Sequence, residues 1–292
     1  MKKTIQTISF VVACISLAAC GGSGKSNTEA GQDSTAVAPK PDSVKDVVLY
    51  NIPSPLETFT ILKMSGSQFD KALLDPIDKL PKYASSFSKS VNLGVYSADL
   101  SFCFMYKQNQ DFNNYLKNVN ELTTALGIDG SYGQEITKRL QANASNMDSL
   151  MVIASEASVN ADLYLKENQR TNTTVLIAVG SWIEGMHIIT SLADKKPESA
   201  VSELVAEQKI PMKNLIKMLA NFESDKEIAD LSKDLKDLNT VFESLQPAKS
   251  NVPAPENKAL KSVGNNTTLE LTKDQLKTIL AKVETLRNKL TL

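Results

Sequence analysis

The stretch TTVLIAVGSWIEGMHIITSL, residues 173–192, decides the fold because it is apolar around almost the whole circumference of a helix. A length of about twenty residues is enough to cross a bilayer. However, Glu184, His187 and two glycines interrupt the stretch, and polar sequence flanks it on both sides. These interruptions favour a buried core helix over a membrane span. A helix that is apolar all round needs neighbours on every face, so the sequence predicts a helical body packed around it.

Helical periodicity continues outward from this core segment in both directions. Residues 85–107 carry apolar side chains on two helix faces, which predicts a second central helix. Residues 147–166 place small side chains inward, including Ala154, which indicates close approach of neighbouring helices. Further along the chain, apolar residues from Ile228 to Leu245 recur at spacings of three and four, as in a bundle. We therefore expect an all-α, multi-helix bundle of roughly eight helices.

Prolines and capping residues set the expected helix boundaries. Two prolines predict broken helical turns over residues 69–82. Pro211 is expected to end one helix and to start the next one, over residues 212–222. Ser224 together with Glu227 fits a capping box at the start of the following helix.

The first twenty residues resemble a secretion signal. Two lysines precede an apolar run, residues 10–19, that is too short to span a bilayer of about 30 Å. The run ends in Leu17-Ala18-Ala19-Cys20, which resembles the lipobox of bacterial lipoproteins. This resemblance implies that residues 1–19 are a signal peptide and that Cys20 is acylated on its thiol and its amine. Several acyl chains would give stable anchoring, since one chain alone binds only marginally. An ordinary cleavable signal with an incidental cysteine is the alternative.

A flexible linker is expected between the lipid site and the helical body. Residues 20–44 are rich in small and polar side chains and hold almost no large apolar residue, so they cannot bury enough surface to fold. The helical domain then spans residues 45–292, with a division near residue 196 as an alternative. In the linker, the triplets Asp-Ser-Thr and Asp-Ser-Val around Ser34 and Ser43 resemble the O-glycosylation pattern of Bacteroidetes. Both serines are therefore candidate glycosylation sites.

The residues that follow the lipobox indicate a location. Gly21 stands where bacterial sorting rules place Asp for retention in the inner membrane, so the resemblance favours the outer membrane. No acidic run of the kind that resembles a surface-export signal follows Cys20. We therefore expect a lipid-anchored protein on the periplasmic face of the outer membrane.

Composition argues against several function classes. The chain has 32 Lys and Arg against 33 Asp and Glu, and the lysines are spread among the acids, which argues against a nucleic-acid partner. Once the signal is removed and Cys20 is acylated, Cys103 is the one remaining thiol, so no intramolecular disulfide is expected. The flanking run SFCFMY favours a buried, inert Cys103 over a reactive one.

The sharpest chemical candidate lies inside the core segment. Glu184 and His187 are three residues apart and share a helix face, like the Glu-x-x-His half of a ferritin-like di-iron site. The full site needs a second such motif, but the chain has a single His, so we expect no metal and no cofactor. Burying Glu184 without a partner would cost several kcal/mol, and Asp99 beside Tyr96 raises the same problem on the other central helix. We interpret Tyr96, Asp99, Glu184 and His187 as a candidate ligand pocket. A hydrogen-bonded structural cluster is the alternative.

Other catalytic signatures are missing from the sequence. The chain has no Gly-x-Ser-x-Gly elbow, no phosphate-binding loop and no dinucleotide fingerprint after a strand. Cys103 and His187 both fall in apolar helices rather than in a loop-built cleft. We therefore assign no catalytic residue.

Four short segments carry a resemblance to a family. YNIPSP at residues 50–55, LGVYSADL at 93–100, YLKEN at 164–168 and GSWIEG at 180–185 are similar to a group of uncharacterised lipoproteins from Bacteroidetes. The resemblance implies a helical protein attached to the cell envelope. It implies no activity and no catalytic residue, because none is assigned to that group.

These observations lead to two hypotheses of function. The first is a non-enzymatic binding or scaffold module at the envelope, held by its lipid anchor, with an envelope protein as a candidate partner. The second is a small-ligand-binding or hydrolytic protein that uses a buried polar pocket around Glu184 and His187. A solvent-connected pocket at those side chains would favour the second hypothesis, whereas a dry, sealed core there, with an exposed apolar groove elsewhere, would favour the first.

Overall fold

A computed structural model describes most of the helical body. It covers residues 52–128, 133–143, 146–196, 200–247 and 269–292, which all belong to one compact unit, Val44–Leu292. The expected signal peptide over residues 1–19, the acylated Cys20, the linker over residues 20–44 and the candidate glycosylation sites Ser34 and Ser43 lie outside these ranges.

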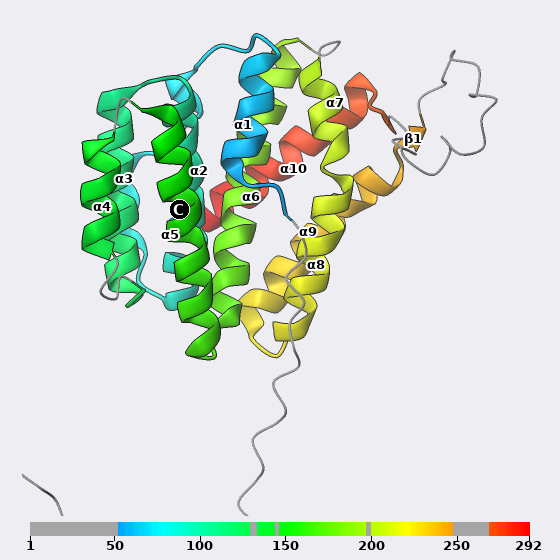
Figure 1. Ribbon diagram of the computed structural model, residues 1–292. Coiled ribbons are helices and arrows are strands. Elements are labelled where there is room, and N and C mark those ends of the chain that lie inside the picture. The colour runs from blue at the N-terminus through cyan, green and yellow to red at the C-terminus, as the bar shows by residue number, and fades with distance from the viewer. Residues whose placement is uncertain (1–51, 129–132, 144–145, 197–199, 248–268) are drawn as a thin grey trace, which may run out of the picture. The chain divides into compact units, whose positions relative to one another are not determined.

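The described ranges contain ten α-helices, more than the roughly eight expected, and they confirm the all-α fold (Figure 1). A single pair of two-residue strands, β1 (Gln246–Pro247) and β2 (Leu269–Glu270), pairs antiparallel in the same part of the chain. The helices are α1 (Pro55–Met64), α2 (Ser86–Met105), α3 (Asn109–Ala125), α4 (Gly133–Ala142), α5 (Met147–Glu167), α6 (Thr171–Lys195), α7 (Ala200–Glu207), α8 (Lys209–Leu219), α9 (Lys226–Glu243) and α10 (Lys273–Thr291).

Helix α6 is the core helix that its sequence predicts. It is the one helix among the described residues that is long and apolar enough to cross a membrane, but 83% of its most apolar window is buried inside the protein. Helices α2, α5, α7 and α10 all contact it. Because neighbours cover α6 on several sides, apolar residues around its circumference are stabilising.

Helices α2 and α6 approach each other at backbone contact distance. A Cβ atom added to Gly94 of α2 would collide with the carbonyl oxygen of Ile177, and one added to Gly180 of α6 would collide with that of Val91. The Ser181 hydroxyl donates a hydrogen bond of 3.0 Å to the Gly94 carbonyl oxygen across the same contact. The two glycines therefore allow the close crossing that positions polar side chains of both helices next to each other.

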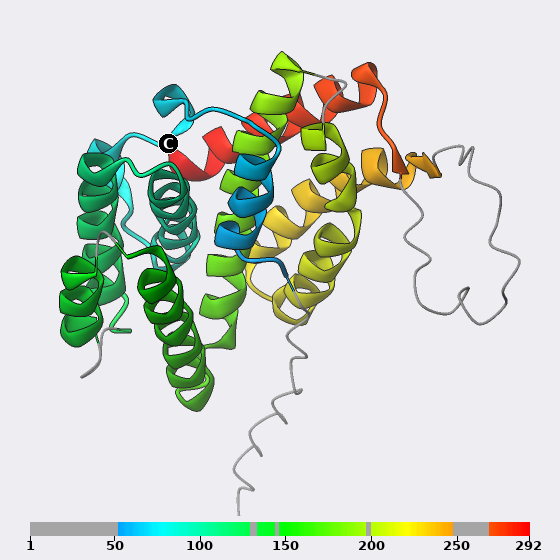
Figure 2. The same ribbon diagram turned by 45° about the horizontal axis from the view of Figure 1, so that its top comes forward.

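The remaining helices surround this central pair. Helices α3–α5 lie on one side of α6 and α7–α9 on the other, as both ribbon views show (Figures 1 and 2). Helix α3 packs on α2, α4 on α5, and α8 on α9, while α10 packs on both α6 and α9. One apolar core runs through these contacts.

The segment between α1 and α2 has the broken helical turns that its prolines predict. Two 3-10 helices, Lys71–Leu73 and Ile77–Lys82, are separated by a short extended stretch that includes Asp75. The side chain of Asp75 is fully buried, although it sits in a connecting segment. This segment therefore brings a carboxylate to the core next to α2 and α6.

Three local predictions were wrong. Helix α8 begins at Lys209 and not at residue 212, so Pro211 is its third residue, where a helix N–H has no acceptor in the preceding turn; the predicted break before it is present, since α7 ends at Glu207. The cap of α9 is Asp225 instead of Ser224, and its carboxylate accepts hydrogen bonds from the backbone N–H groups of Glu227 and Ile228. Ala154 of α5 is exposed instead of facing inward.

Candidate functional site

The four residues of the candidate ligand pocket lie at the contact between α2 and α6. Tyr96 and Asp99 come from α2, and Glu184 and His187 come from α6. The first three are fully buried, and His187 is 9% exposed. The sequence prediction that Asp99 and Glu184 are buried is therefore confirmed, and their polar atoms need partners in the core.

Arg287 of α10 is the partner of Glu184. Its Nε donates to Glu184 Oε2 at 2.5 Å, and its Nη2 donates to Glu184 Oε1 at 2.7 Å. Such a two-pronged pair between guanidinium and carboxylate is among the strongest polar contacts in proteins. Arg287 Nη2 also donates to the Leu73 carbonyl oxygen at 3.4 Å and lies 3.5 Å from Asp75 Oδ1. One arginine thus ties α10 to α6 and to the segment before α2.

Asp75 is hydrogen-bonded to Lys79, Tyr83 and Asp99. Its Oδ1 accepts from Lys79 Nζ at 2.9 Å, and its Oδ2 accepts from the Tyr83 hydroxyl at 3.3 Å. Its backbone N–H donates to Asp99 Oδ2 at 3.1 Å. The backbone carbonyl of Asp75 accepts from the Tyr115 hydroxyl at 2.6 Å. We call Asp75, Asp99, Glu184 and Arg287 the buried ionic cluster.

Tyr96 does not bond to the charged groups of this cluster directly. It binds the backbone of the residue that follows Asp75. Its hydroxyl donates to the Pro76 carbonyl oxygen at 3.0 Å. Asn118 of α3 holds the next residue, since its Nδ2 donates to the Ile77 carbonyl oxygen at 2.8 Å. The carbonyl groups of residues 75–77 are therefore each bound by a side chain from α2 or α3.

Burial dominates the electrostatics of the cluster. It raises the pKa of the Asp99 carboxyl well above its ordinary value of 3.8, and the negative charge of Glu184 raises this pKa further. Burial also raises the pKa of Glu184, although the charge and hydrogen bonds of Arg287 act in the opposite direction. Burial lowers the pKa of His187 to about 4, and the charge of Arg287 acts in the same direction. The imidazole of His187 is therefore neutral at neutral pH.

The sequence prediction missed Arg287 and Asp75. Arg287 stands on the apolar face of α10 between the stripe residues Leu286 and Leu290, a position that would normally be aliphatic, and it is one of three arginines in the chain. A charged residue at an apolar helix position was therefore the feature of the sequence that could have identified Arg287 as a partner of a buried acid. Asp75 lies in a proline-containing connection, where a buried carboxylate has no periodic signature.

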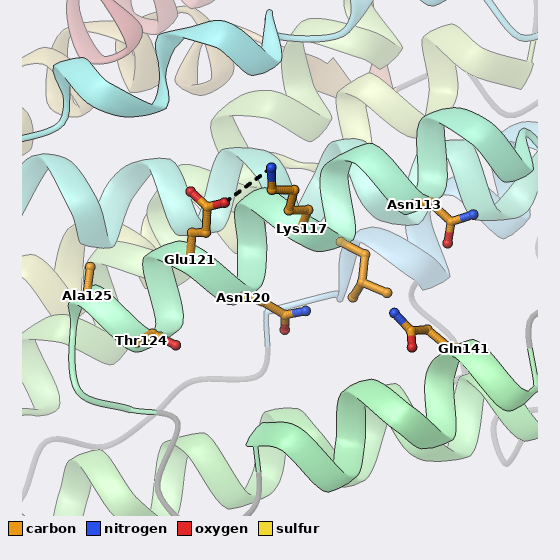
Figure 3. Close-up of a pocket in the computed structure, with 8 residues that line it drawn as sticks. Asn113, Lys117, Asn120, Glu121, Thr124, Ala125 and Gln141 are labelled. Carbon is orange, nitrogen blue, oxygen red and sulfur yellow. Dashed lines mark ion pairs between the residues drawn. The ribbon is translucent and has the colours of Figure 1, made fainter.

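Two grooves on the described part of the protein lie away from this cluster. The larger, of about 700 Å³, lies between α3 and α4 (Figure 3). Carboxamide side chains from both helices line it, together with an ion pair of 3.7 Å between Lys117 and Glu121. The second groove, of about 540 Å³, lies between α9 and α10 and is lined by charged side chains and threonines. Neither groove is lined by a member of the buried ionic cluster or by His187.

The described residues contain no group of three or more His, Cys, Asp or Glu side chains that could hold a metal ion. Cys103 of α2 is fully buried, as its neighbours predict. Burial raises the pKa of its thiol far above the ordinary value. A thiol in this state is a poor nucleophile.

Chemically, the arrangement supplies strong internal contacts, and two buried atoms of the site, Asp99 Oδ1 and His187 Nδ1, have no hydrogen-bond partner among the described residues. Arg287 occupies Glu184 with two hydrogen bonds, and Asp75 receives Lys79 and Tyr83. The Arg287–Glu184 contact joins helices that are 103 residues apart in the chain, whereas Lys79 and Tyr83 bind Asp75 from within the same connection between α1 and α2. Comparison with known proteins finds no matching family model, no matching curated protein and no matching solved structure for this chain.

Proposed function

We propose that the protein is a non-enzymatic binding or scaffold module anchored to the cell envelope by lipid on Cys20. The observation that carries the non-enzymatic part is the occupation of the buried ionic cluster by its own partners. Glu184 is bonded twice to Arg287, and both are enclosed by protein. A general acid or base must reach the proton that it moves in a substrate. A carboxylate sealed in this way stabilises the fold instead.

The anchoring part of the proposal depends on the N-terminal sequence. The lipobox Leu17-Ala18-Ala19-Cys20 and the polar linker after it support a body held near a membrane surface. Gly21 and the lack of a following acidic run support the periplasmic face of the outer membrane. The partner proposed on this basis is the membrane itself, through acyl chains, with an envelope protein as the second partner.

The grooves support recognition more than catalysis. The groove between α3 and α4 offers carboxamides, which both donate and accept hydrogen bonds, and one ion pair. Its lining contains no His and no Cys. Side chains of this kind suit contact with a polar surface of a partner.

Metabolic labelling with an alkyne-tagged palmitate, followed by envelope fractionation, tests the anchor. Wild-type protein should carry the label and sediment with outer membranes. The Cys20→Ala variant should lose the label, while Cys14→Ala, which also removes a cysteine from this region, should keep it. Labelling that survives Cys20→Ala would rule out the proposed lipid site.

The non-enzymatic part has a separate test that uses Cys103 as a reporter. Cys103 lies one helical turn after Asp99, so a reagent that reaches the cluster should reach this thiol as well. In a C14S/C20S variant, in which Cys103 is the single thiol, labelling by a small maleimide should require global unfolding. Rapid labelling of the native protein would reveal an open path and would favour the ligand-binding or hydrolytic alternative.

A further inference from the structure

We propose that Asp99 is protonated in the folded protein and donates this proton to Glu184, so that one trapped proton completes the buried ionic cluster and its loss as the pH rises loosens α10. This goes beyond the proposed function, since it concerns how the fold responds to its environment.

The first observation is the balance of charge. Three carboxyl groups, those of Asp75, Asp99 and Glu184, are fully buried. Two cations face them, Arg287 and the partly exposed Lys79. With all three acids ionised, the cluster would hold one uncompensated negative charge in the core, which is strongly unfavourable. One bound proton removes that excess.

The second observation identifies which oxygen holds the proton. Asp99 Oδ2 accepts from the Asp75 backbone N–H at 3.1 Å. Asp99 Oδ1 is buried and receives no hydrogen bond from any donor in the described residues. An ionised carboxylate oxygen at such a place would be unsatisfied, whereas a protonated one needs only an acceptor.

The third observation supplies the acceptor. Asp99 and Glu184 are both fully buried where α2 and α6 pack on each other, and each carboxyl group acts on the pKa of the other. Two ionised carboxylates offer acceptors only, so a hydrogen bond between these two groups requires a proton on one of them. Glu184 is the ionised partner because Arg287 already donates to both of its oxygens. Each of these oxygens retains a second lone pair to receive the Asp99 hydroxyl.

The other titratable groups around Asp99 do not supply a compensating charge. Tyr83, Tyr96 and Tyr115 have raised pKa values because they are buried, so their phenols stay protonated. The thiol of Cys103 is protonated for the same reason. His187 is neutral because burial lowers its pKa to about 4. The Asp99 carboxyl is therefore the group that balances the cluster.

The pH dependence has a defined sign. Burial and the Glu184 charge place the pKa of folded Asp99 above that of the unfolded chain, so the folded state binds one more proton between the two values. The stability from this proton is complete below the unfolded pKa of Asp99 and is lost as the pH rises through the folded pKa. Across that interval, the equilibrium constant for unfolding increases up to about tenfold per pH unit. Loosening should begin where Arg287 holds α10, since Glu184 and Asp75 both contact this arginine.

Infrared spectroscopy of the full-length protein tests for the proton directly. Wild-type protein at neutral pH should show the carbonyl stretch of a protonated carboxyl group, shifted in D₂O, that is missing from the Asp99→Asn variant. Asp111→Asn, a matched change at an acid of α3 that pairs with Lys71 instead, should keep the band. A wild-type spectrum without this band, or a band that persists in Asp99→Asn, would overturn the proposal.

Denaturant unfolding across pH gives the second measurement. The amide of Asn at position 99 can donate to Glu184 and accept from the Asp75 N–H, so it imitates protonated Asp and should fold. The ratio of unfolding constants, wild type to Asp99→Asn, should rise with pH by up to about tenfold per unit until Asp99 is ionised. Asp111→Asn should show no such rise relative to wild type. A ratio that is independent of pH would contradict the proposed proton.

Discussion

Replacing Arg287 with Met gives the most direct measure of what the buried ionic cluster contributes to stability. The guanidinium makes hydrogen bonds of 2.5 and 2.7 Å to Glu184, and its side chain is 10% exposed. Met preserves the aliphatic stem, so the main loss is the charge that compensates the fully buried carboxylates. Breaking a buried pair by removing one partner costs about 3–5 kcal/mol. We expect Arg287→Met to lower the free energy of unfolding by this amount.

Urea unfolding followed by far-ultraviolet circular dichroism at neutral pH measures this change. Arg139→Met is the matched control, because its pair with Glu156 is exposed on both sides and is screened by solvent, so its loss should change stability far less. The double variant E184Q/R287M removes both charges and should recover about 1–3 kcal/mol relative to R287M alone. An effect of Arg287→Met no larger than that of Arg139→Met would refute the reasoning, as would a double variant no more stable than the single one.

Three further predictions concern other parts of the fold. Gly180→Ala should destabilise the protein by about 1–3 kcal/mol in the same urea assay, because the added methyl group would collide with the Val91 carbonyl. Gly185→Ala is the control: its methyl group would enter open space, so this change should be neutral or stabilising by up to about 1 kcal/mol. The folded pKa of His187, about 4, lies below its unfolded value of 6.5, so His187 contributes stability above pH 6.5 that is lost as the pH falls towards 4. His187→Gln should therefore flatten the stability profile between these pH values by up to about 3 kcal/mol, and a profile parallel to wild type would contradict the assignment. Thr272→Ala, which removes the capping box of α10, should cost about 1 kcal/mol in thermal or urea unfolding, and an unchanged midpoint would mean that the cap contributes nothing measurable.

Much of the secondary structure follows from local patterns. The pattern predicts a helix over residues 173–192 because apolar residues lie around its whole circumference. In the structure this helix extends a few residues further at each end. Helix α2 lies within its predicted range of residues 85–107, and α5 ends one residue beyond its predicted range of residues 147–166. Periodicity succeeds here because it reports which faces of one helix are apolar, and that property is contained in the segment itself.

The partners of the buried polar residues could not be predicted in this way. The sequence indicated that Glu184 needs a partner, but Arg287 lies 103 residues away on another helix. Periodicity describes the faces of α6 and α10 and does not specify which faces meet. The position of the α9 cap failed for a different reason, since Ser224 and Asp225 are both good capping residues and neighbouring turns decide between them.

The attachment of α10 through Arg287 also has a consequence for chain synthesis. Arg287 contacts residues that precede it by 103 and 214 positions, at Glu184 and Leu73. A nascent chain that has emerged as far as α9 contains every acid of the cluster but lacks its arginine. Contacts of such long sequence separation form late in folding. Completion of the core therefore waits for translation of α10, and a product that terminates before Arg287 should retain an open core accessible to proteases.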